Sequence, residues 1–82
     1  MALTETQISY IRGTISRVLG EMLGYRPEFS PSVTITKIES MDEGFLIEGS
    51  YRIFGERGSF KALLSKAFQV INIELKRQEQ GT

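Results

Sequence analysis

The chain has 82 residues, balances ten basic side chains against ten acidic ones, and contains neither cysteine nor histidine. This length fits a single domain, residues 1–82, whose small core is only marginally stable on its own. Without cysteine there are no disulfides, and without cysteine and histidine the two commonest zinc ligands are missing, so we expect no metal site and no cofactor. Unusually good packing or a partner subunit remain as ways to stabilise so small a fold.

The composition also argues against catalysis and against insertion into a membrane. The usual general base and the strongest nucleophile are absent, and no Gly-x-Ser-x-Gly motif occurs. No apolar run approaches the roughly 20 residues of a membrane span, and the first ten residues do not have the pattern of a signal peptide. We therefore expect a non-enzymatic protein of the cytoplasm.

An amphipathic helix is predicted over Thr4–Leu23. Its apolar residues fall on one helical face, with the spacing of a helix that packs against a core: Ile8, Ile11, Ile15, Val18, Leu19 and Met22. Thr4 and Gln7 are spaced as a capping box, in which each side chain accepts a hydrogen bond from the backbone of the other residue. Gly24 is a suitable residue to end the helix, because it readily adopts a left-handed conformation.

A polar connector, whose Tyr25 and Phe29 are expected to cap one end of the core, leads into a predicted β-hairpin. The strands cover Ser32–Met41 and Phe45–Phe54, because apolar and polar residues alternate in both. Residues 42–44, which end in glycine, fit a type I turn followed by a left-handed bulge residue. This turn pairs Met41 with Phe45 and places one apolar set on one face: Val33, Ile35, Met41, Phe45, Ile47, Tyr51 and Ile53.

The C-terminal third of the chain is predicted to be mainly helical. Residues 55–58 form a turn, and Ser59 is a suitable N-cap for a helix that begins at Phe60. An unbroken stripe favours a helix that continues to about Arg77: Phe60, Leu63, Leu64, Ala67, Phe68 and Ile71. In an alternative interpretation the helix ends at Gln69 and a short third strand occupies residues 70–76, where apolar and polar residues alternate.

These elements predict an α+β fold in the order α-β-β-α, an antiparallel hairpin covered on one face by two amphipathic helices. A two-stranded sheet is marginal in water and has two open edges, so we expect self-association or association with another protein. Three apolar side chains point outward in the predicted register and are candidates for that interface: Ile38, Leu46 and Phe54. The alternative is that they are isolated exposed apolar residues, which are common on protein surfaces.

The predicted turn at 55–58 also has a functional interpretation. A Gly-x-x-Gly turn before a helix can present backbone N–H groups to a phosphate. The segment Ile53–Phe60, with the sequence IFGERGSF, resembles the KH module, in which such a loop clamps a single-stranded nucleic acid. A nucleic-acid-binding site would then use Gly55, Arg57, Gly58, Lys61 and Lys66.

The opposing interpretation of this turn is purely structural. Its two central residues, Glu56 and Arg57, leave the loop without net charge, and strand alternation runs almost to Gly55. A turn from strand to helix is therefore favoured over a phosphate loop. The leading hypothesis is a non-enzymatic association domain, in a homo-oligomer or a larger complex, and a nucleic-acid-binding module is the alternative.

Overall fold

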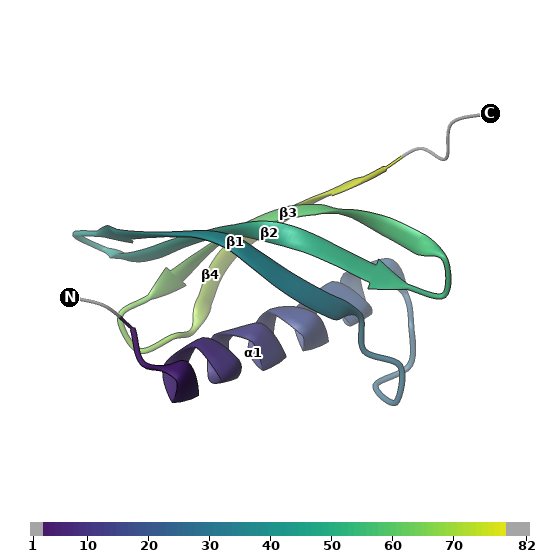
Figure 1. Ribbon diagram of the computed structural model, residues 1–82, viewed down its shortest axis with the longest axis horizontal. Coiled ribbons are helices and arrows are strands. Elements are labelled where there is room, and N and C mark those ends of the chain that lie inside the picture. The colour runs from purple at the N-terminus through teal and green to yellow at the C-terminus, as the bar shows by residue number, and fades with distance from the viewer. Residues whose placement is uncertain (1–2, 79–82) are drawn as a thin grey trace.

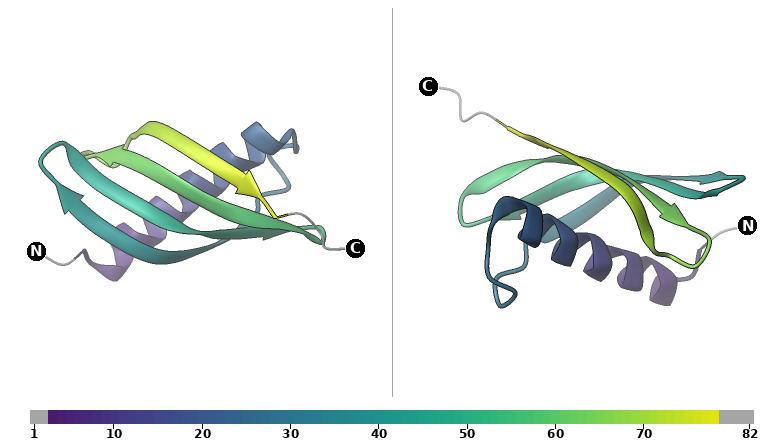
Figure 2. Two further views of the ribbon diagram at one scale, coloured as in Figure 1. Left: turned by 90° about the horizontal axis from the view of Figure 1, so that it is seen from above. Right: turned by 180° about the vertical axis from the view of Figure 1, so that it is seen from behind.

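The computed structural model describes residues 3–78, which form one helix followed by a four-stranded antiparallel sheet (Figure 1). The elements in chain order are α1 (Glu5–Leu23), β1 (Ser32–Met41), β2 (Gly44–Ile53), β3 (Glu56–Ser65) and β4 (Val70–Arg77). Neighbouring strands in the chain are neighbours in the sheet, in the order β1-β2-β3-β4. The helix lies across one face of the sheet, and no described element lies over the opposite, open face (Figures 1 and 2).

The predicted first helix is confirmed, including its caps. The Thr4 backbone N–H donates to Gln7 Oε1 at 2.9 Å, and the Gln7 backbone N–H donates to Thr4 Oγ1 at 3.1 Å. Gly24 ends the helix with a left-handed φ of 85°. Within residues 3–78 no helix is long and apolar enough to cross a membrane.

The core lies between one stripe of α1 and the covered face of the sheet. From the helix come Ile11, Ile15 and Leu19, all fully buried. The first three strands of the sheet contribute buried side chains that pack in one cluster with these helix residues, each at most 9% exposed: Val33, Ile47, Tyr51, Phe60, Ala62 and Leu64. Burying each large side chain of this set contributes about 1.5–3 kcal/mol to the free energy of unfolding.

The predicted second helix is wrong, and with it the α-β-β-α arrangement. Residues 56–77 form β3 and β4, joined by a turn, so this segment consists of strands rather than of a helix. In β3 every second residue is buried, namely Gly58, Phe60, Ala62 and Leu64, which is the period of a half-buried strand. The same segment also fits a helical stripe, and pairing with the otherwise open edge of β2 decides in favour of the strand. The short strand that the alternative interpretation placed at residues 70–76 is present as β4.

The predicted hairpin of β1 and β2 exists, but its register is wrong. Met41 pairs with Gly44, not with Phe45, so the loop has two residues and Gly44 is the first residue of β2. A β-bulge at Thr36 then shifts the pairing once more, because Ile35 pairs with Gly49 and Lys37 with Glu48. The bulge brings Ile38 opposite the fully buried Ile47, on the covered face.

Two glycines on the covered face make room for aromatic rings on the neighbouring strand. Gly49 pairs with Phe60, and a Cβ added at Gly49 would lie 2.9 Å from two ring carbons of Phe60. Gly58 pairs with Tyr51, and a Cβ added there would lie 2.6 Å from the Tyr51 hydroxyl oxygen. Gly58 is therefore required for packing within a strand, which is a different role from the phosphate loop considered for it above.

Both edge strands of the sheet carry a bulge. The extra residue is Thr36 in β1 and Ile71 in β4, where the pairing steps from Leu63 with Asn72 to Leu64 with Val70. A bulge interrupts the regular row of backbone groups that a further strand would need for pairing. The edges are thus less open than those of the predicted two-stranded hairpin.

Candidate functional site

Three aromatic side chains gather at one end of the molecule, where the α1–β1 connector meets the β2–β3 turn. The ring of Phe54 lies 5.7 Å from that of Tyr25 and 5.3 Å from that of Phe29, measured between centroids. Phe54 is 70% exposed and Phe29 is 44% exposed. We call this set, Tyr25, Phe29 and Phe54, the aromatic end; the connector and the turn that carry it lie on the right in Figure 1.

The backbone holds Phe54 in an unusual conformation. Phe54 and Gly55 are the two central residues of the β2–β3 turn, and both have a positive φ, 49° and 79°. Such a turn suits the right-handed twist of a hairpin, but its first central position normally holds Asn, Asp or Gly. A bulky residue there costs on the order of 1 kcal/mol, and such strain is concentrated at functional sites.

Next to the aromatic end, Glu56 forms a hydrogen bond and an ion pair that connect it to neighbouring elements. Glu56 Oε2 accepts a hydrogen bond from the Tyr25 hydroxyl at 3.0 Å, and Oε1 lies 3.1 Å from Nε of Arg77. The connector, the start of β3 and the end of β4 are thereby joined through one half-buried carboxylate. The hydrogen bond to Glu56 raises the pKa of Tyr25 above its ordinary value, because it stabilises the protonated phenol next to a negative charge.

A second tyrosine hydroxyl faces the same carboxylate from within the core. Tyr51 is 2% exposed, and its hydroxyl has no hydrogen-bond partner among the described residues. Burial is the main cause that raises the pKa of Tyr51, and the negative charge of Glu56 acts in the same direction. Tyr51 is therefore a packing residue whose hydroxyl contributes little to stability.

A hollow of about 360 Å³ lies beside Phe54. Phe29, Ile53 and Phe54 give it an apolar part, and Glu28 and Arg52 bring charges of opposite sign to its lining. The aromatic end thus presents an exposed ring and a concave surface next to one another.

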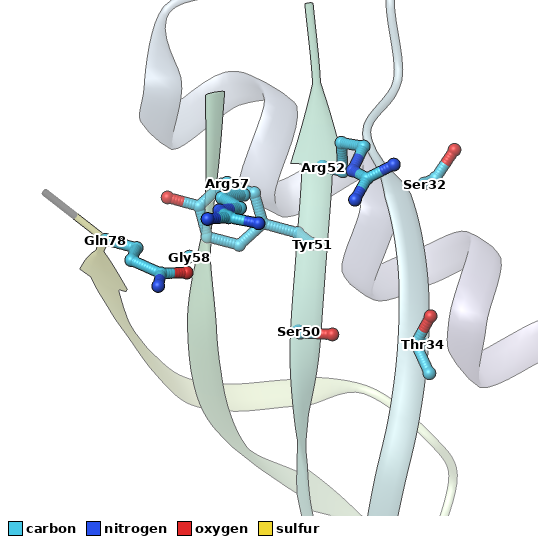
Figure 3. A pocket seen from close by; sticks show the side chains of 8 residues that line it. All are labelled: Ser32, Thr34, Ser50, Tyr51, Arg52, Arg57, Gly58 and Gln78. Atoms are coloured by element: carbon cyan, nitrogen blue, oxygen red, sulfur yellow. The ribbon is translucent and has the colours of Figure 1, made fainter. Parts of the chain in front are cut away.

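Near the aromatic end, the open face of the sheet carries a second feature, a polar groove of about 560 Å³ (Figure 3). Its lining residues come from β1, β2 and β3 and from the residue after β4: Ser32, Thr34, Ser50, Tyr51, Arg52, Arg57, Gly58 and Gln78. Arg52 and Arg57 stand opposite each other on β2 and β3. The lining contains hydroxyl, amide and guanidinium groups but no carboxylate.

The structure separates the residues predicted for nucleic-acid binding. Gly55 lies in the β2–β3 turn, and Gly58 is buried beneath Tyr51. Arg57 and Lys61 share the open face, because they are four residues apart in one strand, whereas Lys66 lies in the turn at the other end of β3. No helix follows the turn, so the feature on which the KH resemblance depended is absent from the described residues.

The residues predicted for an interface are separated as well. Ile38 packs against the core on the covered face, and Leu46 pairs with Leu63 on the open face. Phe54 is the one member of this set that is largely exposed. The structure therefore does not bring the three residues together on one face.

Sequence reasoning missed Arg52 and the contact of Phe54 with Tyr25 and Phe29. Arg52 becomes informative only when the β2–β3 hairpin is known, because that pairing puts it opposite Arg57. The sequence signal for this hairpin was a two-residue turn at Phe54-Gly55 with alternating apolar and polar residues on both sides.

Within residues 3–78 no three carboxylates come close enough together to hold a metal ion. Asp42 and Glu43, at the tip of the β1–β2 turn, are exposed. Comparisons with protein families, curated proteins and solved structures found no match for this chain.

Proposed function

We propose that the chain is a small, non-catalytic association domain that forms a homodimer through its aromatic end. The observation that carries this proposal is Phe54, a 70% exposed aromatic side chain held on a left-handed backbone. Within the monomer the strain at Phe54 is offset only in part, by contacts of its ring with Tyr25 and Phe29. Burial of the ring against a second copy would supply that compensation.

The shape of the aromatic end supports a two-fold symmetric contact. In such an interface the same patch of both copies meets, so a projecting group and the hollow that receives it must lie side by side. Phe54 projects next to the hollow that it lines together with Phe29. Glu28 and Arg52 at the same hollow allow charges of opposite sign to face each other across the two-fold axis.

The sheet edges are less suited to self-association than the aromatic end. Extension of the sheet by a second copy needs a regular edge strand, and bulges interrupt both β1 and β4. Aromatic and arginine side chains, in contrast, are the types enriched at the centres of protein interfaces. This favours Tyr25, Phe29, Arg52 and Phe54 as the contact residues.

The test replaces Phe54 by asparagine and follows association by sedimentation velocity between 5 µM and about 500 µM protein, a range that covers the micromolar affinities of small interfaces. Asparagine tolerates a left-handed backbone, so Phe54→Asn removes the ring without adding strain. The matched control is Ile71→Asn, because Ile71 is 57% exposed but lies at the bulge of β4.

We expect the native chain and Ile71→Asn to dimerise alike, and the dimer of Phe54→Asn to dissociate at least tenfold more readily. The unfolding free energy of the dilute Phe54→Asn monomer should stay within about 0.5 kcal/mol of the native value. A native chain that remains monomeric over the whole range, or equal weakening by both substitutions, would contradict the proposal.

A further inference from the structure

We propose that the polar groove on the open face is a binding site for a phosphate monoester, held between Arg52 and Arg57. This inference concerns a ligand and does not depend on the homodimer. It rests on an unusual arrangement of charge within an otherwise well-matched sheet.

Arg52 and Arg57 are directly opposite on adjacent strands, and like charges in such positions repel each other. Neither guanidinium lies within 4.0 Å of a carboxylate among the described residues. In the row across the sheet that they occupy, their outer neighbours are uncharged, Ser32 on β1 and Gln78 after β4. Among residues 3–78 no carboxylate therefore forms an ion pair with either arginine.

Another row on the same open face shows how the sheet treats charges that serve folding. There Lys37, Glu48, Lys61 and Glu74 follow one another across the four strands, with alternating sign. Lys37 Nζ lies 3.9 Å from Glu48 Oε2. The contrast between the two rows indicates that the arginine pair has a partner other than the sheet.

The groups around the arginines match the acceptors of a phosphate. A phosphate monoester carries close to two negative charges at neutral pH and three terminal oxygens that accept hydrogen bonds. Two guanidinium groups can bind these oxygens in the two-pronged geometry that favours arginine over lysine. The hydroxyls of Ser32, Thr34 and Ser50 line the same groove and make no hydrogen bond to another described residue.

Figure 3 shows these side chains on adjacent strands with the helix behind the sheet, so the groove opens away from the core. Its volume of about 560 Å³ lies within the range of small-molecule sites. Lys76, whose partner across the sheet is Ser59, adds a further cation in the adjoining hollow. The groove is thus large enough for a phosphate together with a small organic group.

A small monoester fits the surroundings better than a nucleic-acid strand does. Glu48 and Glu74, which line the next hollow along the open face, would repel the following phosphates of a polymer. The outward-facing positions of the four strands hold no aromatic side chain on which bases could stack. The positive charge at the groove is therefore suited to a single phosphate group.

The experiment titrates the ¹⁵N-labelled full chain with inorganic phosphate and with glycerol 3-phosphate, against sodium chloride at matched ionic strength. Amide resonances are followed for the native chain, for Arg57→Gln and for the control Lys61→Gln. Lys61 is exposed like Arg57 and lies on the same strand, but it belongs to the row in which charges alternate in sign. The titrations are repeated in the Phe54→Asn background, which keeps the site while removing the proposed dimer contact.

We expect saturable shifts at Ser50, Arg52, Arg57 and Gln78 with both phosphates, and none with chloride. Arg57→Gln should weaken binding at least tenfold, and Lys61→Gln less than twofold. In the Phe54→Asn background saturable binding should persist and Arg57→Gln should still weaken it at least tenfold, so failure of the dimer and failure of this site are distinguishable. The titration extends to about 20 mM phosphate, because a dissociation constant above this concentration would be too weak to indicate a site. Absence of saturable shifts up to this concentration would overturn the proposal.

Two further outcomes would also overturn it. One is equal weakening by Arg57→Gln and Lys61→Gln, because this would show a diffuse charge effect. The other is binding of a ten-nucleotide oligothymidylate more than tenfold tighter than glycerol 3-phosphate, with a steep dependence on salt, because this would assign the surface to a nucleic acid. Circular dichroism of each variant shows whether its fold is retained.

Discussion

Two turns at opposite ends of the molecule each hold a phenylalanine with a positive φ, and they use it differently. Phe68, with a φ of 64°, lies in the β3–β4 turn beside the start of α1, and its ring stacks on Phe45 at 5.6 Å and meets the edge of Tyr10 at 6.3 Å. Phe54, with a φ of 49°, lies in the β2–β3 turn and remains 70% exposed.

The difference between the two turns lies in what offsets the strain. At Phe68 the turn is held by hydrogen bonds to the Ser65 side chain, whose hydroxyl accepts from the backbone N–H groups of Ala67 and Gln69 at 3.2 Å. The ring is half-buried and packed against the core, so the contacts of the monomer account for its conformation. At Phe54 they do so only in part. A strained turn is thus a folding device at one end and, in our proposal, a contact surface at the other.

The largest effect is expected from Gly58→Ala, which tests the register that places Phe54 at the tip of a hairpin. The added Cβ would collide with the Lys76 carbonyl oxygen and the Tyr51 ring, so the free energy of unfolding should fall by about 3 kcal/mol. Ser59, the next residue in the strand, lies on the open face and supplies the control. Ser59→Ala should change the free energy of unfolding by less than about 0.5 kcal/mol. Urea unfolding monitored by circular dichroism measures both. If this segment were a turn and a helix, Gly58→Ala would be tolerated.

Phe68→Asn should have the next largest effect and, together with Phe54→Asn, compares the two turns directly. Asparagine accepts the left-handed backbone, so the substitution removes mainly the contacts with Phe45 and Tyr10. For a half-buried ring we expect a loss of about 2 kcal/mol in the free energy of unfolding. The dilute Phe54→Asn monomer is the comparison, measured by the same urea titration. Equal losses at the two positions would remove the distinction between them.

Tyr25→Phe should have the smallest effect and tests the hydrogen bond between Tyr25 and Glu56. The hydroxyl that donates to Glu56 is lost, which costs about 1 kcal/mol of unfolding free energy because the acceptor is a half-buried carboxylate. The control is Tyr51→Phe, which should be neutral or slightly stabilising because its buried hydroxyl has no partner among the described residues. Thermal unfolding at neutral pH compares the two. A larger loss for Tyr51→Phe would show that its hydroxyl is bonded after all.

Local signals in the sequence were sufficient for the N-terminal half of the fold. The α1 helix has a continuous apolar stripe, a capping box and a terminal glycine, which all agree. The two segments that became β1 and β2 alternate clearly enough to be recognised as strands. Their register was not predictable, because the bulge at Thr36 and the two-residue loop before Gly44 shift the pairing by steps that alternation alone does not reveal.

The C-terminal half shows where local pattern fails. Phe60, Leu64 and Phe68 are four residues apart, so they fit a helical stripe, while Phe60, Ala62 and Leu64 fit an alternating strand equally well. The two interpretations differ in which partner they need. Pairing with β2 satisfies the backbone groups of both strands and leaves α1 alone to cover the sheet.

The candidate sites follow from that pairing. Arg57 was singled out from the sequence as part of a phosphate loop, and it lines the groove for another reason, namely its position opposite Arg52. Phe54 was singled out as an outward-facing strand residue, and it is exposed because it occupies the tip of a turn. In both cases the residue type suggested a binding contact, but the residues that surround Arg57 and Phe54 in the structure differ from those expected from the sequence.

By itself the sequence determined the first helix with its caps and the apolar residues of β1 and β2 that form the core. Those features depend on interactions between residues close in the chain, or on hydrophobic periodicity that any arrangement must bury. Tertiary structure alone decided that residues 56–77 are strands, that the edges carry bulges, and that Arg52 meets Arg57 while Phe54 meets Phe29. These depend on pairing between distant segments, whose free energy no short stretch of sequence contains.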